Sequence, residues 1–590
     1  MSYSRDFDRL SGSFYVDRIG TWTYTVEAWT DRFGTWRSDL EKKAKAGQDI
    51  HSDLLEGAGM VEEAAQGTRG KSGQELARIA KLLRDERTPP EQRADAVLAP
   101  DVVQLMNKHL SPSDLIAAER EHTITVDPPR AACAAWYEMF PRSQSNQPGV
   151  HGTFADAERR LPAIAELGFD VVYLPPIHPI GKVNRKGRNN SLVAERNDPG
   201  SPWAIGSADG GHTAVEPKLG TLEDFERFVE RAKSFDMAVA LDYALQCAPD
   251  HPWVTEHPEW FFVRPDGTIK YAENPPKKYE DIYPLNFWCD DYPALWEACR
   301  DIFLFWIARG VTMFRVDNPH TKPFAFWAWV IEEVKHRYPE TIFLSEAFTR
   351  PARMKGLAKL GFTQSYTYFT WRNTPRELRD YLIELTRTEM VEYFRPHFFA
   401  NTPDILHEYL QTGGRPAFRV RLVLAATLSP LYGIYSGFEL CENTPLRHGS
   451  EEYLHSEKYE VRVRDWDAPG NINADITRIN RIRHEHPALR QLANINFFAS
   501  DNESVLCYHK HAGDDHLLVI ANLDPHHAHE TTVHVPLNAL GLGDEEYYYV
   551  DDLLTGTRYT WSGSRNYIRL DPQEHVAHIL HVQRPQPANA

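Results

Sequence analysis

The sequence predicts a multidomain α/β protein built around a (β/α)8 barrel, with a smaller β domain on each side. Across the middle of the 590 residues, short apolar runs alternate with helical segments, as parallel strands buried on both faces do. A charged helical stretch interrupts β-like alternation near the N-terminus, and alternation returns past residue 495. We expect domains at about 1–130, 131–494 and 495–590.

The first predicted domain begins with strand-like alternation. Residues 12–35 place Trp22, Tyr24 and Val26 on one face of such a strand. Between about 37 and 110, charged segments such as "GQELARIAKLLRDE" indicate helices, and a strand, "HTITVDPP", follows them. We therefore expect an N-terminal β domain that carries a helical insertion.

Eight short apolar runs are the predicted barrel strands. Helical stretches such as "ALWEACRDIFLFWIARG" separate them, which is the order that closes a parallel barrel. A region at about 245–290, rich in Pro, Tyr and Trp, is expected to form a loop subdomain after the third strand. The strands are expected at 134–140, 169–176, 237–244, 311–318, 341–348, 365–369, 396–402 and 431–437.

The last predicted domain is a C-terminal β-sandwich. Runs such as "HLLVIANL" and "TTVHVPL" have the length and spacing of antiparallel strands. Within this domain the stretch "PHHAHE" brings His526, His527 and His529 together, which is one way to bind a metal ion. We prefer the interpretation of a hairpin turn whose histidines are solvated.

Composition excludes several classes of protein. With 83 acidic and 65 basic residues the net charge is −18, whereas nucleic acids and anionic membranes require a basic surface. The most apolar stretch, "LVLAATLSPLYGIY", is too short to span a bilayer, and the N-terminus has no apolar signal segment. The six cysteines form no CxxC pair, which fits a reducing cytoplasm, and no cofactor fingerprint is present. We expect no metal and no cofactor.

Acidic side chains stand at the C-terminal ends of several predicted barrel strands. Asp242 ends the third strand, "MFRVDN" ends the fourth, Glu346 ends the fifth, and Asp404 follows the seventh. In a (β/α)8 barrel these ends share one rim, and active sites lie there. A retaining glycosidase needs two carboxyl groups about 5–5.5 Å apart. The sequence therefore predicts a glycosyl-transfer centre.

The surroundings of these acids indicate different roles. Arg315 and Asp317 share one face of the fourth strand, so Arg315 is expected to lower the pKa of Asp317, as a nucleophile requires. Glu346 has apolar neighbours, which are expected to raise its pKa toward that of a general acid. Asp404 is available to bind sugar hydroxyls. The alternatives are structural: an ion pair at Asp317, a helix N-terminal acid at Glu346 and a turn residue at Asp404.

In chain order, "GFDVVYLPPIHP", "ALDYA", "FRVDN", "SEAF", "NTPD" and "LSPLYGIYSGFE" resemble the signature stretches of the α-amylase superfamily, glycoside hydrolase family 13. The resemblance covers about residues 130–590. It implies the following roles: Asp317 as nucleophile, Glu346 as acid/base and Asp404 as transition-state stabiliser, with Arg315 and Asp242 in support.

Two departures from that pattern point to one branch of the superfamily. Cys247 and Pro403 stand where the first and last signatures usually have histidines that hold the sugar in amylases. Plain starch hydrolysis is therefore not expected. With "NRKGRNN", "GSPWAIGS", "IGSADGGHTAVEPKLGT" and "ENPPKKYEDIYPLNF", the chain resembles the α-1,4-glucan:maltose-1-phosphate maltosyltransferases.

This resemblance implies retaining transfer of maltosyl units from α-maltose 1-phosphate to the non-reducing end of α-1,4-glucans by a cytoplasmic homodimer. The donor's phosphate needs cations and hydrogen-bond donors beside an acidic centre. The resemblance implies that the phosphate is bound by Asn274, Lys277, Tyr279 and Asn318. It implies that the donor sugar is bound by Lys186, Asn189, Gln246 and Arg315. The alternative for both "NPPKKY" and "RKGR" is ordinary solvated loop charge.

Further expectations follow from the same resemblance. Members of the branch have a longer N-terminal β domain, so we expect this domain to be incomplete here, since only about two strands precede the helices. One rival function is an α-glucan hydrolase or 4-α-glucanotransferase that does not use phosphate. Another is a non-catalytic glucan-binding protein, against which the acids at 317, 346 and 404 argue.

Overall fold

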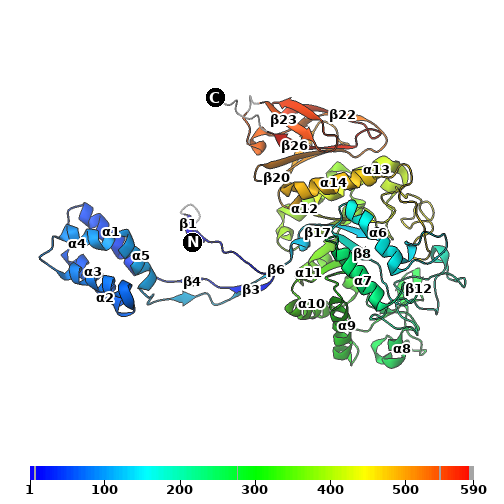
Figure 1. Cartoon of the computed structure of the whole chain (residues 1–590), viewed down its shortest axis with the longest axis horizontal. Coiled ribbons are helices and arrows are strands. Elements are labelled where there is room, and N and C mark those ends of the chain that lie inside the picture. The colour runs from blue at the N-terminus through cyan, green and yellow to red at the C-terminus, as the bar shows by residue number, and fades with distance from the viewer. Residues whose placement is uncertain (5–7, 276, 544–546, 584–590) are drawn as a thin grey trace. The chain divides into compact units, whose positions relative to one another are not determined.

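The computed structural model of the chain describes residues 1–4, 8–275, 277–543 and 547–583, and of Ser2, Tyr3, Asn274 and Lys277 it describes the backbone alone. The chain divides into two compact units (Figure 1). One comprises Met1–Gly20 with Val126–Ala590, and the other comprises Thr21–Thr125.

The larger unit contains the predicted closed barrel of parallel strands. Each strand pairs with the next in the sequence, and the last pairs with the first, which confirms the fold prediction. All eight strands are found, each shorter than expected, because the chain turns away at the rim, as at Asn318, where φ is 43°. The strands are β7 (Ala134–Glu138), β8 (Val171–Leu174), β9 (Ala238–Tyr243), β14 (Met313–Asp317), β15 (Ile342–Glu346), β16 (Gln364–Tyr366), β17 (Pro396–Phe399) and β18 (Leu431–Tyr435).

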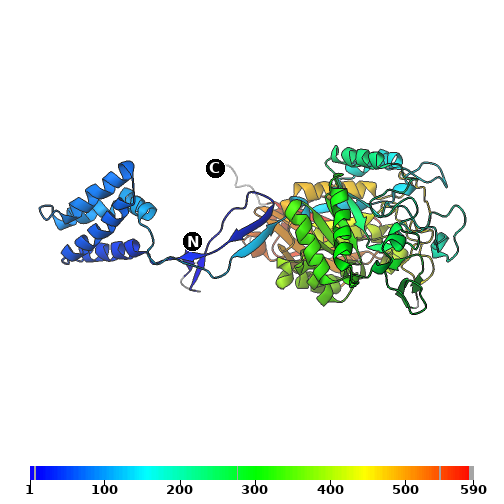
Figure 2. The same ribbon diagram turned by 90° about the horizontal axis from the view of Figure 1, so that it is seen from below.

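Alternate residues of each strand face the barrel interior and the surrounding helices. In β14, Met313 packs inside with other interior residues, while Phe314 and Val316 pack outward in the main core. Helices cover the outside of the barrel (Figures 1 and 2). They include α6 (Phe154–Glu166), α7 (Leu222–Lys233), α9 (Tyr292–Ile307), α10 (Phe324–Arg337), α11 (Pro351–Lys359), α12 (Pro375–Arg387), α13 (Glu408–Leu428) and α14 (Asn473–Glu485).

The smaller unit is a bundle of helices with a core of its own. Trp36, Leu54, Leu76 and Met106 are buried together in that core. The helices begin at Arg32, five residues before the expected start of the insertion at about 37, because Asp31 caps the first one by accepting from the N–H of Gly34. They are α1 (Arg32–Lys45), α2 (His51–Gln66), α3 (Gly70–Arg84), α4 (Pro90–Leu98) and α5 (Pro100–His109).

The β structure of the N-terminal region is sparse. Among the described residues it consists of three two-stranded sheets. Where strand-like alternation was expected at 12–35, the described residues form only the short strands β3 (Gly20–Tyr24) and β4 (Glu27–Ala28), and Val26 between them is 46% exposed. The pairs are β1 (Ser2–Ser4) with β2 (Arg9–Ser11), β3 with β6 (His122–Val126), and β4 with β5 (Ile116–Ala117).

The C-terminal part is an antiparallel sheet domain. Its strands form one continuous sheet in the order β24-β23-β26-β21-β20-β19-β22-β25. The sheet is continuous because β19 pairs with β20 through residues 495–498 and with β22 through residues 499–500. The strands are β19 (Ile495–Ser500), β20 (Val505–Ala512), β21 (Asp515–Asn522), β22 (His529–His534), β23 (Tyr547–Asp552), β24 (Arg558–Ser562), β25 (Arg565–Leu570) and β26 (Ala577–Gln583).

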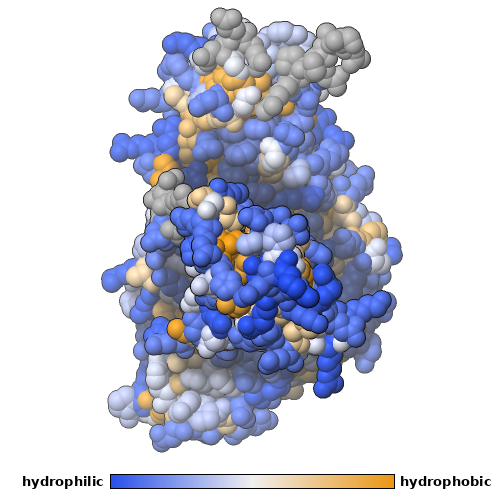
Figure 3. Space-filling model, turned by 90° about the vertical axis from the view of Figure 1, so that its left-hand side faces the viewer, coloured by the Kyte–Doolittle hydropathy of each residue, from blue (hydrophilic) through white to orange (hydrophobic). Residues whose placement is uncertain are grey.

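Polar residues predominate on one face of the molecule. The face drawn in Figure 3 is mostly hydrophilic, and its hydrophobic residues form small groups. Among the described residues, no helix combines the length and the apolar character that crossing a bilayer requires.

Candidate active site

Three predicted acids surround one arginine at the C-terminal rim of the barrel. Parallel pairing of β14 with β15 sets Asp317 directly beside Glu346. The guanidinium of Arg315 lies 2.7 Å from Asp317 Oδ1 and 3.5 Å from Glu346 Oε1. It also lies 3.0 Å from Oδ2 of Asp242 on the neighbouring β9. One buried cation therefore serves three carboxyl groups.

Burial changes the proton affinity of two of these acids. It raises the pKa of Glu346 to about 8, although Arg315 opposes the shift. It raises the pKa of Asp242 to about 7, again against Arg315, while Tyr173 and Trp203 donate hydrogen bonds to the same carboxyl group at 2.6 and 3.3 Å. The direction at Glu346 is the one expected from its apolar neighbours. A protonated Glu346 at neutral pH suits a general acid.

The turn after β14 orients both acids of the pair. Asn318 adopts a left-handed conformation (φ 43°, ψ 51°), which asparagine tolerates better than most side chains. Its backbone N–H donates to Glu346 Oε2 at 3.1 Å and its side chain donates to Asp317 Oδ2 at 3.4 Å. Lys322 holds the turn by donating to the carbonyl oxygens of Asp317 and Asn318 at 3.4 and 3.3 Å.

Asp404 has a cationic partner of its own. The ammonium group of Lys458 pairs with Asp404 and lies 3.0 Å from Glu452. Burial disfavours the charged form of Lys458, but these two carboxylates outweigh burial and raise its pKa well above the usual value. The side chain of Asp404 remains 49% exposed, so it can reach a ligand.

A cavity of about 920 Å³ opens over the acids. Most of the predicted site residues line it: Lys186, Gln246, Tyr279, Asp317, Asn318, Glu346 and Asp404. Arg315 lies beneath it and touches the acids. Asn189 does not line the cavity, since its side-chain oxygen accepts from the backbone N–H of His455 at 2.8 Å; the next residue, Asn190, lines it instead.

Two predicted phosphate ligands have side chains outside the described residues, Asn274 and Lys277. Their backbones pair with each other in a hairpin formed by β11 (Ala272–Asn274) and β12 (Lys277–Tyr279). Ala272, Glu273 and Pro275 of this hairpin line the cavity. The hairpin therefore belongs to the wall of the site.

The cavity contains residues that the sequence analysis missed. Asp281 is buried near Lys186, and burial raises the pKa of its carboxyl group. Its place in the "ENPPKKYEDIYPLNF" stretch was an available signal. Lys458 and Tyr459 come from the long loop after β18, where no local pattern marks them. Trp288 lines the cavity and is 66% exposed.

One of the two departures from the amylase pattern, Cys247, lies away from the cavity. Cys247 is completely buried and is not among the residues that line the cavity. No imidazole therefore stands at that position. A different histidine, His320, lines the cavity just after Asn318.

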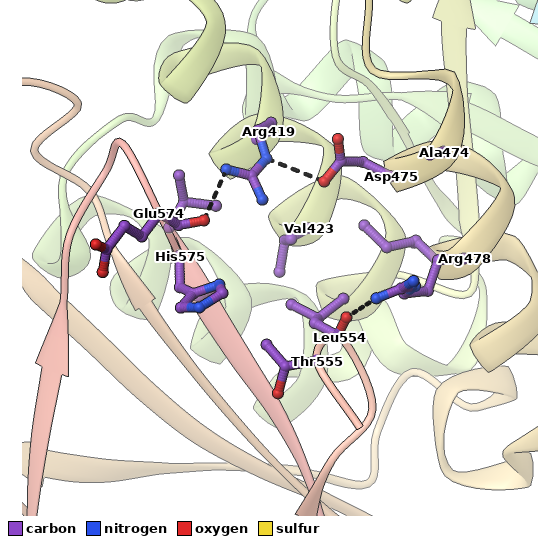
Figure 4. A pocket seen from close by; sticks show the side chains of 12 residues that line it. Arg419, Val423, Ala474, Asp475, Arg478, Leu554, Thr555, Glu574 and His575 are labelled. Atoms are coloured by element: carbon purple, nitrogen blue, oxygen red, sulfur yellow. Dashed lines mark hydrogen bonds and ion pairs between the residues drawn. The ribbon is translucent and has the colours of Figure 1, made fainter. Parts of the chain in front are cut away.

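A second cavity, of about 360 Å³, lies between α13, α14 and loops of the C-terminal sheet domain (Figure 4). Its acid Asp475 is held by Arg419 at 3.0 Å and by Arg415 at 3.3 Å. Arg419 also donates to the backbone oxygen of Glu574 at 3.3 Å. Because Asp475 is already paired with two arginines and the side chain of Glu574 is 67% exposed, this cavity lacks the buried carboxyl pair that glycosyl transfer requires.

The fold and the rim of acids define a protein with the architecture of the α-amylases. Among solved structures, the chain is similar to a maltogenic α-amylase from Thermotoga neapolitana (TM-score 0.58, 20% identity, covering 78% of this chain and all of that one). It is also similar to an α-amylase from Geobacillus thermoleovorans (TM-score 0.60, 17% identity, covering 77% and 99%). These likenesses concern the fold.

Sequence comparisons identify the family within that architecture. Residues 1–128 match the model of domain N/S of α-1,4-glucan:maltose-1-phosphate maltosyltransferase, and residues 497–582 match the model named GLGE, C-terminal. The chain is 54% identical to α-1,4-glucan:maltose-1-phosphate maltosyltransferase 1 of Streptomyces coelicolor over 98% of its own length and 86% of that protein. It is 52% identical to the Rhodospirillum rubrum enzyme of that name over 97% and 84%. The chain belongs to the α-1,4-glucan:maltose-1-phosphate maltosyltransferase family, as its sequence stretches predicted.

Proposed function

We propose that this protein transfers maltosyl units from α-maltose 1-phosphate to the non-reducing end of α-1,4-glucans by double displacement with retention. The observation that carries the proposal is the adjacency of Asp317 and Glu346, which share Arg315 at the floor of a cavity of about 920 Å³. The family to which the chain belongs supplies the identity of the donor and the acceptor.

In the first step Asp317 attacks the anomeric carbon of the donor. The bond between that carbon and the bridging phosphate oxygen breaks, and Glu346 delivers its proton to the departing oxygen. Glu346 can do so because burial raises its pKa to about 8, so that it holds a proton at neutral pH. The products are inorganic phosphate and a β-maltosyl ester of Asp317.

In the second step the acceptor's 4-hydroxyl attacks the same carbon from the face that phosphate left. Glu346, now ionised, takes the hydroxyl proton, and the ester bond to Asp317 breaks. Both acids return to their starting states. Asp404, held by Lys458, binds sugar hydroxyls as the ring flattens in each step.

We propose that the phosphate binds to Asn274, Lys277, Tyr279 and Asn318, and that the donor sugar binds to Lys186, Asn189, Gln246 and Arg315. Support comes from Tyr279 and Asn318, which line the same cavity as the acids. The hairpin that carries Asn274 and Lys277 forms part of its wall. For Asn189 the support is weaker than for Asn190, because its side chain is bound to His455.

The test is release of inorganic phosphate from α-maltose 1-phosphate. We expect release to depend on added maltooligosaccharide, and the oligosaccharide to lengthen by two glucose units per phosphate. Maltose formation without an acceptor requirement would indicate a hydrolase instead. A fluorinated maltosyl donor should trap the ester on Asp317, and a label on any other residue would overturn the assignment.

We further propose a cytoplasmic homodimer that makes a glycogen-like α-glucan, with domain limits at about 1–130, 131–494 and 495–590. All six cysteines lie within the described residues and are unpaired, which fits a reducing compartment. In the smaller unit, Trp29 and Ile116 are 53 and 70% exposed, so large apolar side chains of this unit are available to a partner subunit. Light scattering after gel filtration should give twice the 67.7 kDa chain mass, and a monomer would contradict the dimer.

A further inference from the structure

Three metal-ligating side chains meet where the last helix of the barrel region joins the C-terminal sheet domain. His486 follows the end of α14, Asp515 begins β21 and His581 lies on β26. Their three ligand atoms lie within 4.8 Å of one another. We propose that His486, Asp515 and His581 form a Zn²⁺ site that fastens the C-terminal sheet domain to the end of α14.

The distances suit a tetrahedral zinc ion. Asp515 Oδ1 lies 2.8 Å from His486 Nδ1 and 3.5 Å from His581 Nε2. Zinc bound at about 2.0–2.1 Å with tetrahedral angles separates its ligand atoms by about 3.3 Å. Both contacts of Asp515 Oδ1 are close to this value, and the two imidazole nitrogens lie within 4.8 Å of each other. Three protein ligands leave the fourth position for water. Two imidazoles and a carboxylate are ligands that zinc prefers.

The site is both sheltered and reachable. The side chains of His486, Asp515 and His581 are 12, 14 and 24% exposed. A bound ion would thus lose most of its solvent while retaining a path of entry.

Neighbouring groups hold the ligands in orientation. The backbone N–H of Ala488 donates to Asp515 Oδ2 at 2.9 Å, which fixes the carboxylate and directs Oδ1 toward the two rings. The side-chain amide of Gln583 lies 2.8 Å from His581 Nδ1. This contact, made by the amide nitrogen, restrains the ring of His581.

Another buried group of possible ligands, His212, Cys247 and His251, does not offer free lone pairs. The backbone N–H of Trp253 donates to His251 Nδ1 at 3.0 Å, so Nε2 of that ring carries the proton that bonds His212 Nδ1 at 3.2 Å. His212 Nε2 in turn donates to the oxygen of Ala244 at 2.9 Å. A metal ion would break this chain of hydrogen bonds.

The histidine-rich turn near β22 is also less suitable. His527 is open to solvent, since its side chain is 77% exposed. The sequence does not predict the site at 486, 515 and 581 from spacing, because its three residues come from separate parts of the chain. What competes with zinc at these three residues is a metal-free cluster in which Asp515 is paired with one or both imidazoles.

The experiment uses the full chain without a histidine tag, stripped with a chelator and titrated with Zn²⁺ against a chromophoric competitor. We expect one equivalent of bound Zn²⁺ and a rise in the unfolding temperature on binding. Asp515→Asn and His581→Gln should each weaken binding by more than about 100-fold, since loss of a ligand costs more than loss of its hydrogen-bond partner. His526→Gln, in the exposed turn, is the matched control and should bind as the unchanged protein does.

Substitution with Co²⁺ gives a second readout, because a tetrahedral site produces visible absorption that both ligand variants should lose. Absence of stoichiometric Zn²⁺ binding by the unchanged protein would overturn the proposal. Equal affinity in Asp515→Asn, His581→Gln and the unchanged protein would also overturn it. Circular dichroism of the metal-free variants shows whether they fold. The acids of the barrel rim lie elsewhere, so phosphate release by the stripped protein tests the transferase separately.

Discussion

The two cavities of the larger unit differ in the balance of arginines and acids. At the barrel rim three acids share one arginine, whereas in the other cavity one acid has two arginines. At the barrel rim Arg315 serves Asp242, Asp317 and Glu346. In the cavity of Figure 4, Asp475 pairs with Arg419 and also with Arg415, which lies outside the lining. An excess of buried carboxyl groups cannot be fully ionised at low cost, whereas a carboxylate between two cations can.

This difference in charge balance distinguishes a reactive site from a structural one. Where acids outnumber cations, burial raises the pKa of Glu346 to about 8, and one acid can carry a proton beside an ionised neighbour. Where cations outnumber acids, the carboxylate serves as a fixed anchor between helices. A buried arginine-acid pair therefore indicates a reactive site only when the count of neighbouring charges is considered.

The largest expected difference between the two cavities comes from removing one acid from each. Asp317→Asn should lower phosphate release by more than about 10,000-fold, because it removes the nucleophile. Asp475→Asn keeps the shape of the other cavity and should leave release within about twofold. Initial-rate assays measure both. Comparable losses in the two variants would show that the charge count does not distinguish the sites.

The proton on Glu346 gives the next largest effect. Glu346→Gln should lower kcat/KM for α-maltose 1-phosphate by about 100- to 10,000-fold, because the departing oxygen loses its proton donor. In the unchanged enzyme, kcat/KM should fall as pH rises through about 8, where Glu346 ionises. A pH-rate profile of both proteins checks this expectation. If the same descending limb persists in Glu346→Gln, another group is the acid.

The charge balance also predicts how stability depends on pH. The pKa of Glu346 is higher in the folded chain, about 8, than the value of about 4.3 in an unfolded chain. Its contribution to stability is therefore fully present below the unfolded value and is lost as pH rises through the folded value. The unfolding temperature of Glu346→Gln relative to the unchanged protein should rise between pH 5 and about pH 8. A difference independent of pH would contradict the shift.

Lys458 tests whether an acid at the rim needs its own cation. Lys458→Met keeps the length of the side chain but leaves Asp404 and Glu452 without their shared partner. We expect kcat/KM to fall by about 10- to 100-fold, as for other groups that orient a reacting residue. Arg419→Met, the matched change in the cavity of Figure 4, should leave kcat/KM near that of the unchanged enzyme. A similar loss in both would indicate a general effect on folding.

The sequence predicts the fold better than it predicts the walls of the site. The barrel strands were recognisable because each is a short apolar run, and the rim acids because they end such runs; Asp317 and Glu346 then meet through strand pairing alone. Lys458 was missed because it reaches Asp404 only after the long loop beyond β18 folds back. Asn189 was predicted to bind the donor sugar, but a left-handed turn directs its side chain to His455 instead.

The smallest predicted effect concerns the wall of the catalytic cavity. Trp288 is 66% exposed there, whereas the twelve described residues around the cavity of Figure 4 include no Phe, Tyr or Trp. A sugar ring stacked on an indole gains about 1–1.5 kcal/mol, so Trp288→Ala should raise KM for the maltooligosaccharide by about 5- to 10-fold. The kcat/KM for α-maltose 1-phosphate should hardly change if the ring contacts only the acceptor. The control is Tyr567→Ala, which removes an exposed aromatic side chain on β25 and should leave KM unchanged. Equal KM values for the unchanged enzyme and Trp288→Ala would mean that the acceptor does not bind against Trp288.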